Sequence, residues 1–266
     1  MMKAPLHKQA FSLVELSIVL VILGLLTGGI LTGQSLIRAA ELRAVTTEFQ
    51  TYQTAVMTFR DKYFALPGDM RNATDFWGAM TNCGAASPSG SGTETCNGDG
   101  DGQIDDPTTA GQTGESFGFW RHLANAGLIE GTYTGISESG GSVANADVGV
   151  NVPASKLGRA GWTTVNFDDE ANIVGTYGNV LFFGQATAIG RTVSVALSTE
   201  ETWNIDTKID DAKPWLGKVV VQTGQGSSGT NCANAVASSQ AVSAAAEYEL
   251  SNRNTLSCSI IFRSAF

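Results

Sequence analysis

The chain has 266 residues and a formal net charge of -9 at pH 7. This acidic balance disfavours general nucleic-acid binding, because such binding draws on many basic contacts with phosphates. The length fits one exported domain beside a membrane segment, and the four cysteines suit a compartment that permits disulfides.

An apolar segment from Phe11 to Ile37 comes first, and Glu15 is its one charged residue. The segment exceeds the roughly 20 apolar residues that a helix needs to cross a bilayer, so residues 11–37 are predicted to span a membrane once. An unpaired carboxylate inside a membrane costs roughly 2.5–3.5 kcal/mol at the helix centre. We therefore expect Glu15 to have a partner; an ordinary anchor with an accidental glutamate is the alternative.

A short leader with two lysines and a histidine precedes this segment and ends in the small residue Ala10. A secretory signal has its cleavage site after the apolar run, whereas this small residue stands before it. Cleavage between Ala10 and Phe11 would leave the apolar segment on the mature chain. It would also create an α-amino group one helical turn from Glu15, and the amine of one chain could pair with the carboxylate of its neighbour.

The sequence KQA followed by FSLVELSIVLVILGLL closely resembles the N-terminus of type IV prepilins and of the related pseudopilins of type II secretion, over about residues 7 to 35. The resemblance implies cleavage and N-methylation by a prepilin peptidase, with Phe11 as the first mature residue and Glu15 as the assembly glutamate. It also implies other pilin or pseudopilin subunits and an inner-membrane assembly platform as partners. The chain departs from the family in two features: Ala10 replaces the usual Gly, and four glycines stand along the span in place of a proline.

An amphipathic continuation follows the apolar segment. Apolar residues recur there at spacings of three and four, at Leu42, Val45, Phe49, Tyr52, Val56, Phe59 and Tyr63. This stripe predicts that one helix runs from Phe11 to about Tyr63 and ends before Pro67, since the residue before a proline avoids helical geometry. Its aromatic residues favour docking onto a sheet over the alternative, a free coiled coil.

The rest of the chain reads as loops, short helices and strands. Residues 70–113 are rich in Gly, Ser, Thr, Asn and Asp and predict an extended loop. A short helix is predicted near residues 117–124, and a capping box of Ser198 and Glu201 predicts another towards Ile209. The predicted strands are residues 162–167, 180–183, 193–197, 218–222 and 259–262.

These elements predict an α+β fold like that of type IV pilins, with a long N-terminal helix packed on a mainly antiparallel sheet with long loops. The predicted parts are a leader over residues 1–10, the helix over residues 11–64, and a globular exported domain over residues 65–266. The helix would be half in the membrane and half against the sheet.

The acidic stretch from Asn97 to Asp105 matches the first two-thirds of an EF-hand-type calcium loop. It has oxygen-bearing side chains at alternate positions, a glycine at the sixth and an isoleucine at the eighth. The candidate calcium ligands are Asn97, Asp99, Asp101, Gln103 and Asp105. Thr108 stands at the twelfth position in place of Glu, so Asp105, Asp106 or a distant residue would have to complete the shell. A solvated acidic turn is the alternative.

Two local cysteine pairs are favoured. Cys83 and Cys96 bracket a Gly/Ser-rich interval next to the acidic stretch, and Cys232 and Cys258 bracket an Ala/Ser-rich segment near the C-terminus. Spacing alone leaves other pairings and free thiols open. The second pair also fits the resemblance, because a C-terminal disulfide commonly ties an outer loop in pilins.

A second acidic segment carries Asp206, Asp210 and Asp211. These carboxylates could bind a second cation, but we favour a helix-ending, salt-bridged turn because acidic runs are usually solvated. Asp210 and Asp211 are not expected to form a catalytic pair, since adjacent side chains point in different directions and no nucleophile or base accompanies them. No enzymatic activity is therefore predicted.

The residues and the resemblance together predict a structural subunit of a type IV pilus or a related filament. It would be held in the bacterial inner membrane by one span with a cytoplasmic N-terminus, then moved into an extracellular or periplasmic filament. The large, irregular globular region favours a minor or specialised subunit. Two alternatives remain open: a minor pseudopilin of type II secretion, and a membrane-tethered extracytoplasmic binding module that does not polymerise.

Overall fold

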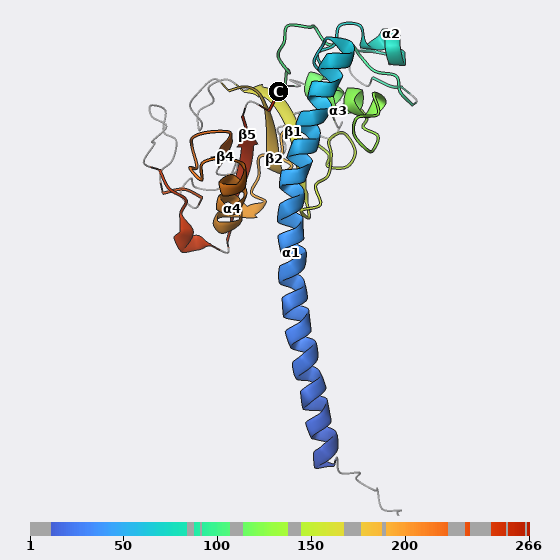
Figure 1. Cartoon of the computed structure of the whole chain (residues 1–266). Helices are drawn as coiled ribbons and strands as arrows, with labels where there is room; N and C mark the ends of the chain where they lie inside the picture. The colour runs from blue at the N-terminus through green and yellow to red at the C-terminus, as the bar shows by residue number, and fades with distance from the viewer. Residues whose placement is uncertain are drawn as a thin grey trace, which may run out of the picture. The chain divides into compact units, whose positions relative to one another are not determined.

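The computed structural model describes residues 12–83, 88–90, 92–106, 114–137, 145–167, 177–187, 190–222, 232–234, 246–253, 255–263 and 265–266. The helices are α1 (Leu13–Tyr63), α2 (Ala73–Trp77), α3 (Glu115–Asn125), α4 (Thr199–Ile209) and the 3₁₀ helix η1 (Leu250–Asn252) (Figure 1). The strands are β1 (Ala160–Phe167), β2 (Gly178–Gln185), β3 (Leu197–Ser198), β4 (Val219–Gln222) and β5 (Leu256–Phe262).

The chain forms two compact units, Met1–Glu41 and Leu42–Phe266. Helix α1 contributes to both, so its second half belongs to the same unit as the strands. The helix ends at Tyr63 as the apolar stripe predicts, and Phe11 lies outside the described residues. Phe64 follows in the left-handed region with φ 54°, and its amide donates to the Arg60 carbonyl at 2.8 Å, which closes the last turn.

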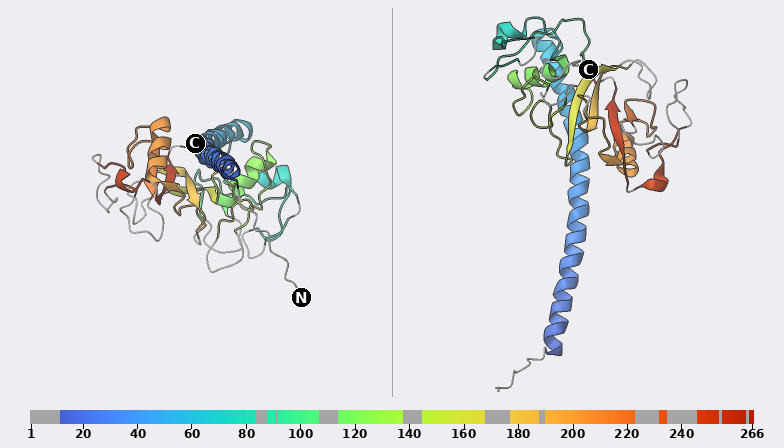
Figure 2. Two further views of the ribbon diagram at one scale, coloured as in Figure 1. Left: turned by 90° about the horizontal axis from the view of Figure 1, so that it is seen from below. Right: turned by 180° about the vertical axis from the view of Figure 1, so that it is seen from behind.

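The sheet is antiparallel in every strand pair and has the order β1-β2-β5-β3, with β4 also paired to β5. Strand β5 therefore lies between β2 and β4 in the sheet, which Figure 2 shows from two further directions. Its residues from Ser257 to Phe262 are all buried. Of the predicted strand 193–197, Leu197 alone belongs to β3, because Ser194 forms an isolated bridge with Gln185 at the end of β2 instead of pairing with β5. The predicted α+β class with a mainly antiparallel sheet is confirmed.

The second half of α1 packs its apolar stripe against the core of this unit. The buried residues of the helix are Val45, Phe49, Tyr52, Ala55, Val56 and Phe59. Phe49 stacks on Phe262 of β5 with 4.3 Å between ring centroids, and Tyr52 meets Trp120 and Trp162 edge-on at 5.0 and 5.5 Å. Each large apolar side chain buried in this way contributes about 1.5–3 kcal/mol. The aromatic stripe therefore serves docking onto the sheet, as predicted.

One carboxylate fixes how α1 sits on this core. Glu48 accepts hydrogen bonds from the Lys156 amide at 3.0 Å and from the Trp162 indole nitrogen at 2.8 Å. Both donors come from the chain around the start of β1, more than 100 positions from Glu48. The bonds therefore set the register of the helix on the sheet, which apolar packing alone defines less sharply.

The predicted loop over residues 70–113 contains a short helix, α2, which sequence reasoning missed. A helix of five residues has little stability of its own, and tertiary contacts hold it here. The Asn97 side-chain oxygen accepts from the Thr74 amide at 2.9 Å, and Trp77 packs on Tyr63 with 5.4 Å between ring centroids.

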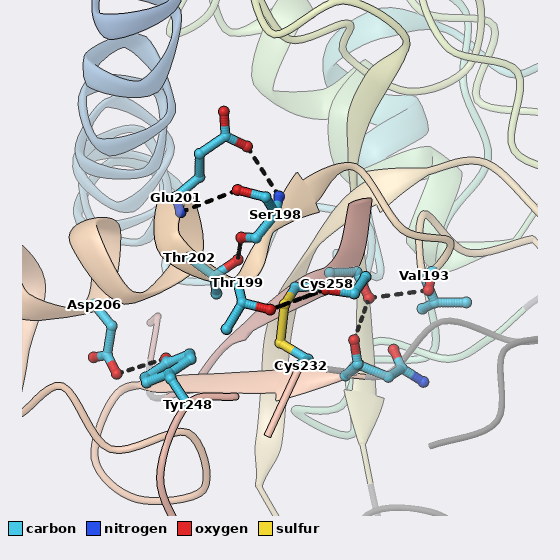
Figure 3. The surroundings of a disulfide bond; sticks show 12 residues. Val193, Ser198, Thr199, Glu201, Thr202, Asp206, Cys232, Tyr248 and Cys258 are labelled. Atoms are coloured by element: carbon cyan, nitrogen blue, oxygen red, sulfur yellow. Dashed lines mark hydrogen bonds between the residues drawn. A yellow bond between two sulfur atoms is a disulfide. The ribbon is translucent and has the colours of Figure 1, made fainter. Parts of the chain in front are cut away.

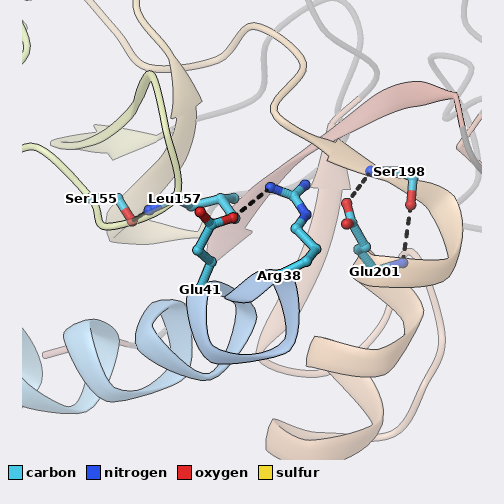
Figure 4. A network of polar contacts seen from close by, with 6 residues as sticks. All are labelled: Arg38, Glu41, Ser155, Leu157, Ser198 and Glu201. Atoms are coloured by element: carbon cyan, nitrogen blue, oxygen red, sulfur yellow. Dashed lines mark hydrogen bonds and ion pairs between the residues drawn. The ribbon is translucent and has the colours of Figure 1, made fainter. Parts of the chain in front are cut away.

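Helix α4 begins with the predicted capping box and ends at Ile209 as predicted. The Ser198 hydroxyl accepts from the Glu201 amide at 3.3 Å, and the Glu201 carboxylate accepts from the Ser198 amide at 2.9 Å (Figure 4). Within the first unit, Figure 4 also shows the ion pair between Arg38 and Glu41 at 3.1 Å. This pair lies near the surface, so it contributes at most about 1 kcal/mol.

Two disulfides join Cys83 to Cys96 and Cys232 to Cys258, and Figure 3 shows the second of them. These are the local pairs that the spacing favoured. The second disulfide links Cys258 of β5 to Cys232, which lies between β4 and η1 in the sequence.

The contacts of Glu48 predict a loss of stability when its carboxylate is removed. Glu48→Ala leaves the Lys156 amide and the buried Trp162 indole without their acceptor, and a buried unsatisfied donor costs about 1–3 kcal/mol. We expect the free energy of unfolding to fall by that amount, measured by chemical unfolding of the processed chain in detergent. Thr47→Ala is the control, because Thr47 bonds only within its own helix. Equal stability of Glu48→Ala and wild type would contradict the anchoring role.

Candidate functional site

The start of α1 carries the assembly glutamate of the sequence analysis. The Glu15 carboxylate accepts a hydrogen bond from the Ser12 amide at 2.9 Å. A carboxylate in the first turn is favoured there, because the free amides and the positive end of the helix dipole attract it. Ala10 and Phe11 lie outside the described residues. In sequence, however, Phe11 directly precedes Ser12, so cleavage after Ala10 would add a positive charge beside this turn.

Large apolar side chains cover the helix from this point to Ile37. Each of the following is at least half exposed within its unit: Leu13, Val14, Leu16, Ile18, Val19, Leu20, Val21, Ile22, Leu23, Leu25, Leu26, Ile30, Leu31, Leu36 and Ile37. Among the described residues, α1 is the one helix long and apolar enough to cross a membrane, by length and composition. Such a surface is stable in lipid or against other apolar helices.

Four glycines interrupt this apolar surface at Gly24, Gly28, Gly29 and Gly33. A Cβ atom built on any of them meets no other atom within 4 Å in the single chain. Intrachain packing therefore does not explain their small size. Their spacing forms small-xxx-small patterns, which let a second helix approach the backbone closely.

The acidic loop is the second candidate site, and two carboxylates from outside the predicted motif join it. Oxygen atoms of Asp69, Asp99 and Glu115 lie within 4.8 Å of one another. Asp69 accepts from the amides of Asp101 and Gly102 at 3.2 and 2.9 Å. Glu115, the first residue of α3, accepts from the Asp99 amide at 2.9 Å and the Asp105 amide at 3.0 Å. These bonds wrap the loop around the two carboxylates.

The electrostatics of this cluster disfavour three bare negative charges. Burial, together with the charges of Asp69 and Asp99, raises the pKa of Glu115 to about 7. Burial also raises the pKa of Asp69 above its ordinary value. Arg71 donates to the backbone carbonyls of Asp99 and Gly100. Carboxylate groups held this close favour a bound proton or a hard cation with oxygen ligands.

The other predicted ligands are placed differently. The Asn97 side chain binds the amide of Thr74, and Asp101 accepts from the amide and side chain of Gln103 at 2.8 and 3.3 Å. Asp106 pairs with Arg191 at 2.5 Å, and the twelfth position, Thr108, lies outside the described residues. Of the five predicted ligands, Asp99 alone joins the three-carboxylate cluster in the described part of the chain. Sequence reasoning missed Asp69 and Glu115 because neither lies within the motif.

Behind the acidic loop, the buried His122 of α3 fixes the turn that carries Asp69. Its Nδ1 atom accepts from the Gly68 amide at 2.9 Å, and its Nε2 atom lies 2.9 Å from the Thr95 hydroxyl. Gly68 has φ +85°, and a Cβ there would come within 2.4 Å of the Glu115 carbonyl. Burial, with a smaller contribution from the Arg121 guanidinium, lowers the pKa of His122 to about 4. The imidazole is therefore neutral at pH 7.

Comparison with known families identifies the N-terminal site. The prokaryotic N-terminal methylation motif matches residues 6–31. This motif is the hallmark of type IV pilins and pseudopilins, and it confirms the resemblance drawn from the sequence. The motif implies processing by a prepilin peptidase and assembly with other pilin subunits, and together with the apolar helix it fits a membrane-anchored precursor. No curated protein and no solved structure matches the chain.

The burial of His122 predicts how stability depends on pH. Below about pH 6.5 the unfolded chain binds a proton on this imidazole, whereas the folded chain does so only near its pKa of about 4. The free energy of unfolding therefore falls as the pH drops through this window. His122→Gln can keep one acceptor and one donor but does not titrate, so its unfolding energy should fall less between pH 6.5 and 4. Parallel pH profiles for the two proteins would contradict the buried neutral imidazole.

Proposed function

We propose that the chain is a structural subunit of a type IV pilus or a related filament. The observation that carries this proposal is the matched methylation motif on a helix whose apolar surface is exposed and whose first turn holds Glu15. Before assembly, the segment to Ile37 anchors the processed chain in the inner membrane. After extraction by the assembly platform, the same surface packs against the helices of other subunits. The role is structural, with no catalytic step.

Glu15 explains why assembly is favoured over staying in lipid. In the membrane its carboxylate has no partner on a neighbouring chain, and a carboxylate in lipid is unfavourable. In a helix bundle it accepts the α-amino group of Phe11 from an adjacent subunit, and the low dielectric of the bundle strengthens this pair. The glycines from Gly24 to Gly33 allow the neighbouring helices to approach closely.

The proposal favours a minor or specialised subunit. The unit Leu42–Phe266 carries long non-repetitive segments between its strands, two disulfides and two acidic clusters, which exceeds what filament packing alone requires. A tether that never polymerises is the competing function. The exposed apolar helix suits both, but a tether has no use for a carboxylate in lipid.

We also propose that the acidic loop binds calcium through Asp69, Asp99 and Glu115. Three carboxylates supply the hard oxygen ligands that calcium prefers, and backbone carbonyls and water can complete its six to eight ligands. Burial raises the pKa of both Asp69 and Glu115, which agrees with a site that is stabilised by a cation. Glu115 takes the place of the glutamate that the motif lacks at Thr108, and it lies 16 positions from Asp99.

The assembly role is tested with Glu15→Ala. The variant removes the unfavourable carboxylate from lipid and abolishes the pairing with Phe11, so it should insert and be processed normally yet be absent from filaments. Sheared surface filaments probed for this chain give the measurement, with total membrane levels as the reference. Ser17→Ala is the matched control, because its hydroxyl bonds only to the Val14 carbonyl of its own helix. Equal incorporation of Glu15→Ala and wild type would refute the assembly role, and absence of both from filaments would favour the tether.

Calcium binding by the acidic loop predicts a rise in thermal stability. A ligand that binds the folded state alone stabilises it by about 2.7 kcal/mol at roughly 100 times its dissociation constant. The thermal midpoint of wild type should therefore rise with calcium more than that of Asp99→Asn with Asp101→Asn. Both side chains are exposed, so the variant should fold. Glu130→Gln with Glu247→Gln removes the same charge from exposed positions outside the acidic loop and should respond like wild type. An identical calcium response in the Asp99/Asp101 variant would leave a solvated turn as the better interpretation.

A further inference from the structure

A second group of carboxylates meets at the end of α4. Oxygen atoms of Asp206, Asp210 and Asp211 lie within 4.8 Å of one another. Asp206 belongs to the last turns of the helix, and Asp210 is its C-terminal cap. The negative end of a helix dipole is an unfavourable place for three carboxylates, so some other interaction must compensate for their proximity.

Asp206 is the unusual member of this group, because its side chain is fully buried. One carboxylate oxygen accepts a hydrogen bond from the Tyr248 hydroxyl at 2.7 Å (Figure 3). The other, Oδ1, is buried and makes no hydrogen bond of ordinary geometry, although the Ala212 amide lies close enough to the carboxyl group to lower its pKa. A buried oxygen of this kind is costly unless a ligand satisfies it. Burial, together with the charges of Asp211 and Asp210, raises the pKa of Asp206 to about 7.

Backbone amides hold the other two carboxylates in place. Asp210 accepts from the amide of Lys218, and Asp211 accepts from the amide of Lys213 at 2.8 Å. The chain before β4 passes directly over Asp210, since a Cβ built on Gly217 would fall 1.6 Å from its carboxylate. One backbone donor therefore orients each of these two carboxylates, Asp210 and Asp211.

The salt-bridged turn favoured from the sequence does not describe this cluster. Lys208, Lys213 and Lys218 are close in sequence, yet among the residues described here no ion pair joins a lysine or arginine to these three carboxylates. The negative charges therefore lack a countercharge from the described side chains. The carboxylates of Asp210 and Asp211 also lie close to the Oδ1 atom of Asp206, which makes no hydrogen bond of ordinary geometry.

We propose that Asp206, Asp210 and Asp211 form a second binding site for a hard divalent cation, with calcium as the preferred ion. A cation there would be coordinated by the Oδ1 atom of Asp206 and by oxygens of its two neighbours. Several protein carboxylates suit calcium better than magnesium, which keeps most of its water shell. The Tyr248 hydroxyl binds the other oxygen of Asp206 and would hold that carboxylate in place beside the ion (Figure 3).

The test counts calcium ions bound to the full processed chain in detergent, by calorimetric titration and native mass spectrometry. Asp210→Asn with Asp211→Asn should bind one calcium ion fewer than wild type. Asp211→Asn alone changes an exposed side chain, so it should fold and bind the same ion roughly tenfold more weakly. Asp61→Asn with Glu130→Gln is the charge-matched control and should bind as many ions as wild type.

A different variant tests calcium binding at the acidic loop independently of the site at Asp206. The variant with Asp99→Asn and Asp101→Asn should keep the ion at Asp206. A variant that also carries Asp210→Asn and Asp211→Asn should lose this ion. Failure of either calcium proposal therefore leaves the other measurable. An equal number of ions in wild type and the Asp210/Asp211 variant, with an unchanged affinity in Asp211→Asn, would overturn this site and leave a protonated Asp206 instead.

Discussion

The burial of one helical stripe governs the unit Leu42–Phe266. From Leu42 onward, α1 presents aromatic and aliphatic side chains to the core, and Phe49 stacks on Phe262 of the central strand β5. Because the stripe is narrow, the helix has one orientation on the sheet, and Glu48 fixes its register through Lys156 and Trp162. Two disulfides, Cys83–Cys96 and Cys232–Cys258, add covalent cross-links to this unit.

Before Glu41, the same helix has an exposed apolar surface instead of a buried stripe. Its apolar side chains find no partner within their own unit, and its glycines leave space that no intrachain atom fills. A continuous helix can meet both requirements because its backbone bonds are satisfied internally in water, in lipid and in a bundle alike. In the proposed function, the first half of this helix serves assembly and the second half serves folding. There Glu15 supplies the charge that distinguishes assembly from a simple anchor.

Periodicity and local chemistry predict the parts of this structure that short-range forces determine. The end of α1 at Tyr63, the capping box at Ser198 and the strand near 162–167 follow from spacing, capping and β-propensity. Contacts between distant residues could not be predicted in this way. Glu115 reaches Asp99 and Tyr248 reaches Asp206 only through the tertiary fold. Helix α2 was missed for the same reason, since contacts with Asn97 and Tyr63 hold it rather than its own composition.

The proposed function requires that the chain enters a filament as a processed subunit. The most direct measurement is the intact mass of this chain recovered from sheared surface filaments, with sequencing of its N-terminal peptide. We expect a chain that begins at Phe11 and carries one methyl group on its α-amino nitrogen. Recovery of assembled chains that retain Met1 and the leader through Ala10 would contradict it.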